Sequence, residues 1–544
     1  MYPNLEDLLA QFQPRDLQRL ITPSLERGLR SLVREGPERD QRWLAQCVLA
    51  SHGVNLFRRQ DARKGLFRLM PSAELQRVAE ELTGRSYQKP EDNAIALARL
   101  KWRPGADVVV FAAKHFGIPY AFLPHTDARS PTVETLEVVS RLPALHDYQE
   151  EVRSQVIPLL KTPGEAFLVQ MPTGSGKTRT LVESIVSVWG DSLSNGSIIW
   201  LAHQEELCEQ AAEAFTRVWT ERAGAPTRLV RFFGGHDPPP YAAPGSIVIA
   251  SLQKAYARLK ARSSFTDAII DSGKVIVVDE AHQALAPSFH KVISSLTSRG
   301  AVLAGLSATP GRGVHQESEN RRLAKVFGGR LISPPGAGEM INRLQQSGVL
   351  ARLRRKEIET GLEVEPNEQD LASLRLGFDY GTSVLRVLAA DQSRNDLIVQ
   401  SVEQEVTGQR PTIVFACTVE HARLLSAALN LRGVRASYVD GDMDRTDRQY
   451  AISRFRDGTI DAITNFGVLT TGFDAPRTRT VVVARPTTSA ILYGQMVGRA
   501  LRGPRMGGGS EAWVIDVRDN LRRFGGVTQV YHAFERFWGD LDRT

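Results

Sequence analysis

Phosphate chemistry is predicted by the segment Pro-Thr-Gly-Ser-Gly-Lys-Thr, which follows the apolar run FLVQM at residues 167–171. Gly174 and Gly176 can adopt backbone angles closed to other residues, so the N–H groups of the loop can turn toward one anion. Lys177 adds a charge for the outer phosphates, and Thr178 offers a hydroxyl to Mg²⁺ at the start of a helix whose dipole also favours an anion. We expect the phosphates of a nucleotide to be bound by Thr173, Gly174, Ser175, Gly176, Lys177 and Thr178.

Two adjacent carboxylates end a second apolar run, KVIVVDEAH at residues 274–282. Ligands of open parallel sheets gather at the carboxyl edge of the strands, where Asp279 and Glu280 are expected. Asp279 can hold Mg²⁺ through its water shell, and Glu280 can orient and polarise the attacking water, since phosphoryl transfer requires mainly positioning and charge. A solvated strand end is the alternative, although two acids after four apolar residues are costly to desolvate without a cation nearby.

The elements that position these residues follow from the alternation of short apolar runs with helical patterns after about residue 145. This alternation is typical of parallel strands joined by crossover helices. One block contains FLVQM, SIIWLA, SIVIAS, KVIVVDE and AVLAGLSAT, and a second contains TIVFAC, ASYVDG, DAITNF, TVVVAR and AWVIDV. We predict an α/β fold class with two tandem doubly wound parallel-sheet domains, at residues 141–335 and 336–544, preceded by a mostly helical module at residues 1–140.

Composition narrows the class of protein. A chain of 544 residues with 42% apolar residues exceeds one hydrophobic core and is ample for about three packed units. Its net charge of +7 suits a polyanionic partner. Cys47, Cys208 and Cys417 lie far apart without a CxxC pair, so neither a disulfide framework nor a zinc finger is supported. The chain shows no run of eighteen apolar residues and no signal-peptide pattern at its start, so we expect a cytoplasmic protein with no membrane partner.

Five motifs in order carry a family resemblance. They are MPTGSGKT (171–178), DEAH (279–282), SATP (307–310), TNFGVLTTGFDAP (464–476) and QMVGRALR (495–502). Over roughly residues 145–525 the chain resembles superfamily 2 helicases of the DEAH-box-containing group. The last two motifs are most similar to the branch that includes RadD, XPB and restriction-enzyme motor subunits. The resemblance implies two RecA-like domains, ATP and Mg²⁺ as cofactors, and ATP hydrolysis coupled to movement along nucleic acid or to its unwinding.

The resemblance also implies roles for individual residues. Lys177 and Glu280 would be catalytic, and Arg499 and Arg502 would be arginine fingers, because residues three apart share a helical face. A surface arginine pair is the alternative for the latter two. Nucleotide contacts are implied for Gln149, Gly472 and Asp474, and Asp279 would join Thr178 at the metal. Residues expected to couple hydrolysis to nucleic acid are His282, Ser307, Thr309 and Gln495.

Contacts with a nucleic-acid backbone are expected from two places. The first is the set of motif residues His203, Gln204, Gln253, Thr418 and Thr464, each of which could instead be a satisfied loop residue. The second is the basic run LFRRQDARKGLFR (56–68), where phosphate contacts are expected from Arg58, Arg59 and Arg63, and where helical spacing would put Arg59, Arg63 and Lys64 on one face. A solvated helix face is the alternative for this run.

The sequence therefore predicts an ATP-dependent helicase or translocase. The motif wording favours DNA over RNA, and the family analogy suggests bacterial repair, restriction or phage defence. An RNA helicase stays open, as does an ATP-gated nucleic-acid sensor that controls a partner effector. The sequence shows no nuclease-like carboxylate cluster, so any cutting is expected to come from a partner nuclease.

Overall fold

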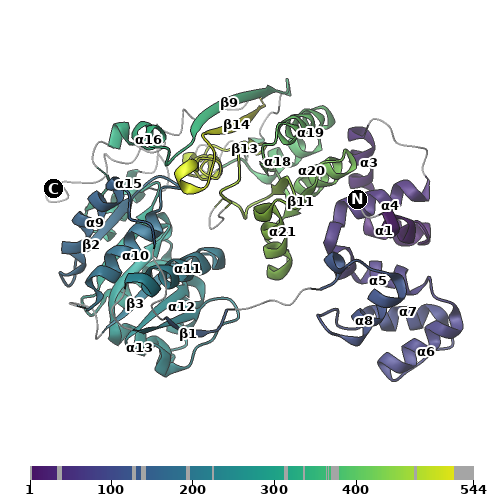
Figure 1. Ribbon diagram of the computed structural model, residues 1–544, viewed down its shortest axis with the longest axis horizontal. Helices are drawn as coiled ribbons and strands as arrows, with labels where there is room; N and C mark the ends of the chain where they lie inside the picture. Colours follow the sequence, from purple (N-terminus) through teal and green to yellow (C-terminus); the bar gives the residue numbers. More distant parts are fainter. Residues whose placement is uncertain are drawn as a thin grey trace.

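The computed structural model describes residues 3–33, 40–124, 130–136, 142–190, 196–222, 226–311, 317–334, 337–362, 364, 367–368, 370, 379–470 and 475–519. Within these residues the chain forms a helical N-terminal region and two α/β units, each built on one sheet (Figure 1). The predicted fold class is confirmed.

The first sheet has eight strands in the order β1-β4-β5-β3-β6-β7-β2-β8. In chain order they are β1 (Val133–Leu136), β2 (Ala166–Gln170), β3 (Ser197–Ala202), β4 (Thr227–Phe232), β5 (Ser246–Ser251), β6 (Gly273–Asp279), β7 (Val302–Ser307) and β8 (Leu331–Ile332). All neighbouring strands pair in parallel except β1, which runs antiparallel to β4. β3, β5 and β7 are buried along their whole length, which is why they appear in the sequence as continuous apolar runs.

Helices cover both faces of this sheet. They are α9 (Asp147–Leu160), α10 (Lys177–Val188), α11 (Glu205–Arg222), α12 (Leu252–Lys260), α13 (Ser264–Ser272), α14 (Pro287–Thr297) and α15 (Glu317–Val326), with α16 (Ala337–Gln346) following β8. Short 3-10 turns lie at Pro240–Ala242 and Ala281–Gln283. Side-chain caps fix several helix starts, as where Ser251 accepts a hydrogen bond from the backbone N–H of Lys254.

The second sheet is parallel throughout, in the order β11-β12-β10-β13-β14-β9. Its strands are β9 (Arg352–Glu359), β10 (Thr412–Phe415), β11 (Ala436–Val439), β12 (Ala462–Asn465), β13 (Thr480–Val483) and β14 (Glu511–Arg518). Its helices are α18 (Thr382–Ala390), α19 (Gln392–Thr407), α20 (Val419–Leu431), α21 (Arg445–Asp457) and α22 (Ala490–Val497), with the 3-10 turn η6 at Pro504–Met506.

The N-terminal region is helical and packs on the second α/β unit. Its helices are α1 (Pro3–Leu9), α2 (Pro14–Leu20), α3 (Pro23–Leu32), α4 (Gln41–His52), α5 (Gln60–Phe67), α6 (Ser72–Thr83), α7 (Pro90–Arg99) and α8 (Asp107–Phe116), with 3-10 turns η1 (Gly53–Arg58) and η2 (Tyr120–Phe122). α3 and α4 lie against α20, and the apolar side chains of the two parts form one continuous core. α3 and α20 are in close contact, because a Cβ on Gly28 of α3 would lie 2.9 Å from Leu424 Cδ1 of α20.

The boundary predicted at residue 140 needs correction. β1 lies within the range assigned to the N-terminal module, yet it pairs with β4 and so belongs to the first sheet. This strand could not be predicted from the sequence, because a four-residue edge strand is too short to show a hydrophobic period. The described helices include none that combines the length and hydrophobicity needed to cross a bilayer.

Candidate nucleotide-binding site

The loop between β2 and α10 has the backbone shape expected for phosphate binding. Gly174 and Gly176 have φ angles of 83° and 84°, in the left-handed region that other residues avoid. A hydrogen bond within the loop stabilises this shape, because the Ser175 hydroxyl donates to the Pro172 carbonyl at 2.7 Å. Lys177 and Thr178 begin α10, so the helix N-terminus faces the same space.

Gln149 supports this loop. Its amide nitrogen donates to the Ser175 carbonyl at 3.2 Å, and the Tyr148 hydroxyl donates to the same oxygen at 2.7 Å. The other end of the Gln149 amide accepts from the backbone N–H of His146 at 2.9 Å and caps α9. Both ends of the Gln149 amide are therefore engaged within the protein, and one of them supports the phosphate loop.

Asp279 and Glu280 end β6, and both side chains are buried. Burial raises the pKa of Asp279 to about 7, and the charge of Glu280 adds to the rise, while Lys177 opposes it. Burial would also raise the pKa of Glu280, but His282 and Lys177 hold it at about 2, and His282 Nδ1 lies 3.3 Å from Glu280 Oε2. Asp279 and Thr178 both carry hard oxygen donors, which is the ligand type that suits Mg²⁺.

The second α/β unit contacts the phosphate loop directly. A Cβ on Gly174 would lie 3.5 Å from Arg502 Cγ, and a Cβ on Gly498 would lie 2.7 Å from Thr173 Cβ. Burial lowers the pKa of Lys177, and the charges of Arg499 and Arg502 lower it further. The structure thus brings the two predicted arginine fingers to the loop and carboxylates of the first unit.

Some residues predicted to couple hydrolysis to nucleic acid also lie together. Ser307 ends β7 beside Gln170 of β2, and its hydroxyl donates to the Thr309 carbonyl at 2.7 Å. Burial lowers the pKa of His203, and the charge of His282 lowers it further. Gln253 is connected to His203, because its amide donates to the His203 carbonyl at 2.8 Å. Gln495 is buried on α22, and its backbone carbonyl accepts from Arg499 Nε at 3.2 Å.

Thr464 does not offer its side chain to a backbone phosphate. It is fully buried at the end of β12, and its hydroxyl donates to the Ala422 carbonyl at 2.7 Å, so that prediction is wrong. Thr418 caps α20 by accepting from the backbone N–H of His421 at 3.1 Å. His203 and Gln204 are half-buried next to the start of α11, and Gln253 is exposed, so these residues stay candidates for nucleic-acid contact.

The basic run at residues 56–68 does not form one phosphate-facing stripe. Its first residues belong to η1 and α5 begins only at Gln60, so the expected common helix face does not exist. Arg63 is buried, donates to the carbonyls of Ala98, Phe57 and Arg58, and stacks 5.4 Å from the centre of the Trp102 ring.

The prediction that Arg63 binds nucleic acid is therefore wrong, because its guanidinium is enclosed in the N-terminal core. Arg58 forms an ion pair of 2.8 Å with Asp447 of α21, whereas Arg59 is exposed. Gly472 and Asp474, which we expected to contact nucleotide, lie outside the described residues.

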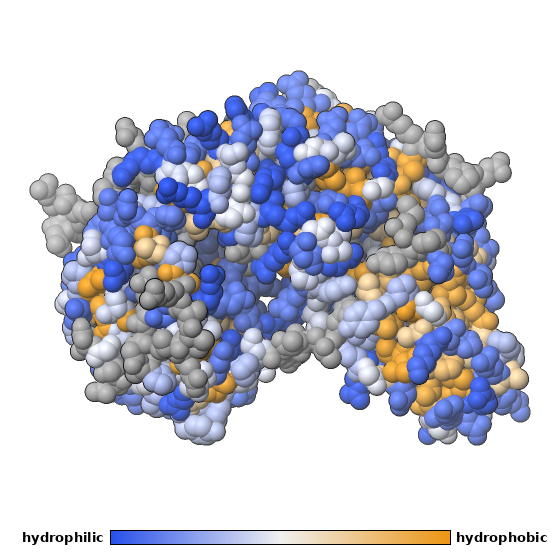
Figure 2. All heavy atoms as spheres, in the orientation of Figure 1, coloured by the Kyte–Doolittle hydropathy of each residue, from blue (hydrophilic) through white to orange (hydrophobic). Residues whose placement is uncertain are grey.

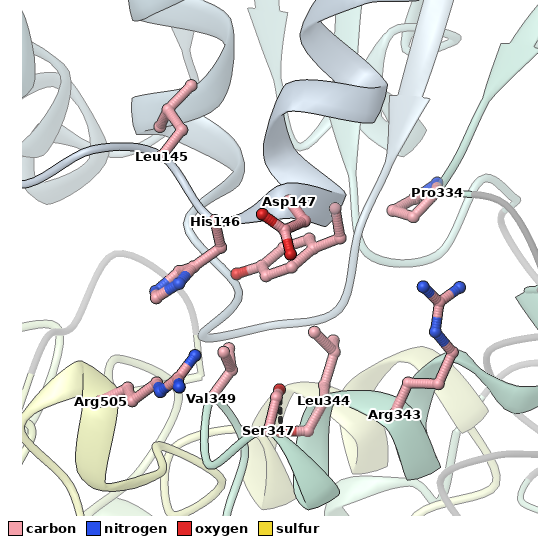
Figure 3. Close-up of a pocket in the computed structure, with 10 residues that line it drawn as sticks. Leu145, His146, Asp147, Pro334, Arg343, Leu344, Ser347, Val349 and Arg505 are labelled. Carbon is pink, nitrogen blue, oxygen red and sulfur yellow. Dashed lines mark hydrogen bonds between the residues drawn. The ribbon is translucent and has the colours of Figure 1, made fainter.

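A cavity of about 220 Å³ lies beside the phosphate loop and takes its walls from both α/β units. One wall comes from the start of α9 and the other from α16, the segment after it and η6 (Figure 3). Its lining residues are Leu145, His146, Asp147, Tyr148, Pro334, Arg343, Leu344, Ser347, Val349 and Arg505. Sequence reasoning missed Arg343 and Arg505; for Arg505, a signal was the spacing of three residues after Arg502.

Comparison with known proteins agrees with this geometry. Residues 142–312 match the family described as type III restriction enzyme, res subunit, and residues 394–504 match the helicase conserved C-terminal domain. The chain is 22% identical over 383 residues to the putative ATP-dependent helicase IRC3 of Saccharomyces cerevisiae, covering 68% of this chain and 51% of that protein.

Restriction enzymes are among the other relatives. The type I restriction enzyme EcoKI endonuclease subunit of Escherichia coli is 27% identical over 406 residues, covering 66% of this chain and 33% of that subunit. A fragment of a putative HsdR subunit of a type I restriction enzyme from Vibrio vulnificus aligns with a TM-score of 0.49 and 20% identity, covering 69% of this chain and 64% of the fragment. The aligned part thus spans about half of the yeast protein and a third of the E. coli subunit.

Proposed function

We propose that the chain, whose two matched domains are those of superfamily 2 helicases and fit the restriction-motor branch, hydrolyses ATP to move along nucleic acid or to unwind it. The observation that carries this proposal is the contact between the two units at the phosphate loop. Arg502 lies beside Gly174, so the second unit supplies cations to a nucleotide held by the first.

Each residue of the site has a definite task in this proposal. The loop N–H groups and Lys177 bind the phosphates, and Glu280 orients the attacking water. Arg499 and Arg502 stabilise the charge that develops as the phosphoryl group leaves. Thr178 and Asp279 would hold Mg²⁺, which would supply positive charge to the phosphates.

Movement would follow from changes in the contact between the units. ATP favours their closure, because the arginines act only when they reach the phosphates, and product release allows the units to separate. His203 and Gln253 lie on the path from Glu280 through His282, so they are placed to pass this change to a bound strand. The space-filling view shows mainly hydrophilic side chains around the hollow at the centre of the molecule, which suits a polyanion (Figure 2).

We propose DNA as the substrate, in bacterial restriction, repair or phage defence, because the relatives include restriction-enzyme subunits. Any cutting of the DNA would be the task of a partner nuclease. RNA helicases also match over shorter segments, such as SrmB of Haemophilus influenzae over 146 residues, so RNA is the competing substrate.

The test compares ATP hydrolysis without nucleic acid and with single-stranded DNA, duplex DNA or RNA, using Lys177→Ala as the matched inactive variant. We expect DNA to stimulate hydrolysis more than RNA and the variant to show no turnover. Greater stimulation by RNA would make the chain an RNA motor, and equal turnover in the variant and the wild type would end the proposal. Stimulation by DNA without displacement of a bound strand or protein would favour the ATP-gated sensor.

A further inference from the structure

The start of α21 carries charges that reach two other parts of the chain. Arg445 and Arg448 pair with carboxylates at the start of α11 in the first unit, as in the contact of 2.7 Å between Arg448 Nη2 and Glu206 Oε1. Asp447 lies between these two arginines in the sequence, and its Oδ1 lies 2.8 Å from Arg58 Nη2 of the N-terminal region. The start of α21 therefore lies between the first unit and the N-terminal region (Figure 1).

The two halves of α21 are held by different forces. In the second half, Ala451, Ile452 and Phe455 are buried, and the Arg477 guanidinium lies 5.7 Å from the centre of the Phe455 ring. In the first turn the buried side chain is that of Asp447, an acid. Burial of an unpaired carboxylate is costly, so Asp447 requires a cation. The position of the first turn therefore depends on the ion pairs that its side chains form.

Arg58 is held in a fixed place by the N-terminal region. It ends η1, its neighbour Phe57 is buried, and its carbonyl accepts a hydrogen bond from Arg63 Nη1 at 2.8 Å. The same region is joined to α20, because the Asn430 amide donates to the Ala50 carbonyl at 3.2 Å and the two parts share one apolar core. Arg58 therefore contacts α21 from a support that is itself packed on the second unit.

The balance of charge at this junction gives the added cation a definite effect. α11 contributes three carboxylates to the contact, whereas α21 contributes two arginines and the carboxylate of Asp447. Without Arg58, the carboxylate of Asp447 would compete with those of α11 for the two arginines. When Arg58 pairs with Asp447, the side chains of Arg445 and Arg448 can remain with α11.

We propose that Arg58 is a positioning residue for the contact between the two α/β units, because it holds the first turn of α21 where Arg445 and Arg448 reach α11. The inference rests on the proposed ATP hydrolysis, in which closure of the units brings the arginine fingers to the nucleotide. Arg58 lies outside residues 142–312 and 394–504, which match the two families. The N-terminal region thereby influences the rate of hydrolysis from outside the nucleotide site.

The experiment measures ATP hydrolysis without nucleic acid at several salt concentrations. It compares the wild type with Arg58→Ala, with Asp447→Asn and with the variant that combines both changes. Each single substitution should lower kcat by roughly 2- to 5-fold at low salt, as expected for loss of one partly exposed ion pair. The combined variant should lose no more than either single variant, because both changes remove the same contact. The kcat of all three variants should depend less on salt than that of the wild type.

A second measurement reports on the arrangement of the units. Small-angle X-ray scattering without nucleotide should give a larger radius of gyration for Arg58→Ala than for the wild type, because the units separate more often. Arg58→Lys keeps the charge that pairs with Asp447 and should recover most of both effects. Arg42→Ala is the matched control, since Arg42 pairs with Glu6 and Asp7 within the N-terminal region, and it should change neither kcat nor the radius.

A kcat, salt dependence and radius of gyration in Arg58→Ala equal to those of the wild type would overturn the proposal while ATP hydrolysis stands. Additive losses in the combined variant would also overturn it, because Arg58 and Asp447 would then act separately. If the wild type hydrolysed no ATP, the proposed function would fail, and the radius of gyration would still decide whether Arg58 helps to join the units.

Discussion

Arg445 of α21 and Glu209 of α11 form an ion pair between the two α/β units, with 2.9 Å between Arg445 Nη2 and Glu209 Oε1. Arg445 also contacts Glu205 at 3.1 Å, and Arg448 contacts Glu206 at 2.7 Å. These contacts hold the start of α21 against the start of α11, directly after His203 and Gln204. The units are thus joined by charge at a second place, away from the phosphate loop.

These ion pairs should support closure in the absence of nucleic acid. Partly exposed pairs contribute about 0.2 to 1 kcal/mol each, so replacing Arg445 and Arg448 together by Ala should lower basal ATP hydrolysis by roughly 3- to 10-fold at low salt. The basal rate of the variant should also depend less on salt concentration, because the variant lacks the ion pairs that salt would screen. Arg435→Ala, which breaks a pair with Asp461 inside the second unit, is the control. A double variant with wild-type rate and salt dependence would contradict this role.

Glu280→Gln should separate binding from hydrolysis. The amide keeps the shape of the side chain but lacks the charge that orients the attacking water, so turnover should fall by about 10²-fold or more while ATP still binds. Equilibrium binding of ATP and single-turnover hydrolysis measure the two steps. If the variant failed to bind ATP, Glu280 would be a binding residue.

Arg499→Ala and Arg502→Ala test the contribution of the second unit to chemistry. Each variant should reduce kcat by about 10²-fold, with a much smaller change in nucleotide affinity, because the guanidinium acts on charge that develops in the transition state. Steady-state kinetics and equilibrium binding distinguish the two effects. Near-normal hydrolysis in both variants would leave the second unit as a scaffold.

Arg63→Ala should destabilise the N-terminal region. The substitution leaves the carbonyls of Ala98 and Phe57 without their buried donor, which costs about 2 to 4 kcal/mol and should lower the thermal unfolding midpoint. Exposed Arg59 is the matched position, and Arg59→Ala should change stability by less than about 0.5 kcal/mol.

Binding isotherms at several salt concentrations then test Arg59 for phosphate contact. Loss of one contact should reduce the slope of log K against log salt by about 0.7 to 0.9. An unchanged slope would assign Arg59 to a solvated surface.

Mild acid should destabilise the same region. Burial lowers the pKa of His52 to about 4, and its Nε2 donates to the Leu20 carbonyl at 2.6 Å as a neutral ring. The unfolded chain has the ordinary value near 6.5, so it binds the proton more readily. The contribution of neutral His52 to the free energy of unfolding is fully present above about pH 6.5. It is lost as the pH falls toward 4, and the loss is about 3 kcal/mol at most.

The measurement is the thermal unfolding midpoint between pH 7.5 and 5, in the wild type and in His52→Gln. The glutamine keeps a donor for Leu20 but does not titrate, so its midpoint should fall less with acid. Burial also places the pKa of His421 well below its ordinary value. Protonation of His421 therefore also destabilises the protein in acid, and this effect is present in both the wild type and His52→Gln. Equal acid sensitivity of the two proteins would contradict the assignment to His52.

The sequence alone predicted the elements and residues whose chemistry is local. The loop around Gly174 and Gly176 could be predicted because positive φ angles favour glycine, and β6 could be predicted because a strand buried on both faces is a continuous apolar run. Asp279 and Glu280 follow that strand directly, so their place at the sheet edge was implied by chain order.

Tertiary structure decided the features in which distant segments meet. Arg63 resembles any other arginine in a basic run, and only the fold shows that Ala98 and Trp102 enclose it. Likewise, the motif around Thr464 suggests a side chain that is free to contact nucleic acid. The tertiary structure shows that α20 packs on β12 and buries its hydroxyl. The cavity lined by His146 and Arg505 joins residues more than 350 positions apart, with a docking geometry that no local pattern specifies. Side-chain periodicity reports which face of an element is buried, whereas what covers that face depends on how the units pack.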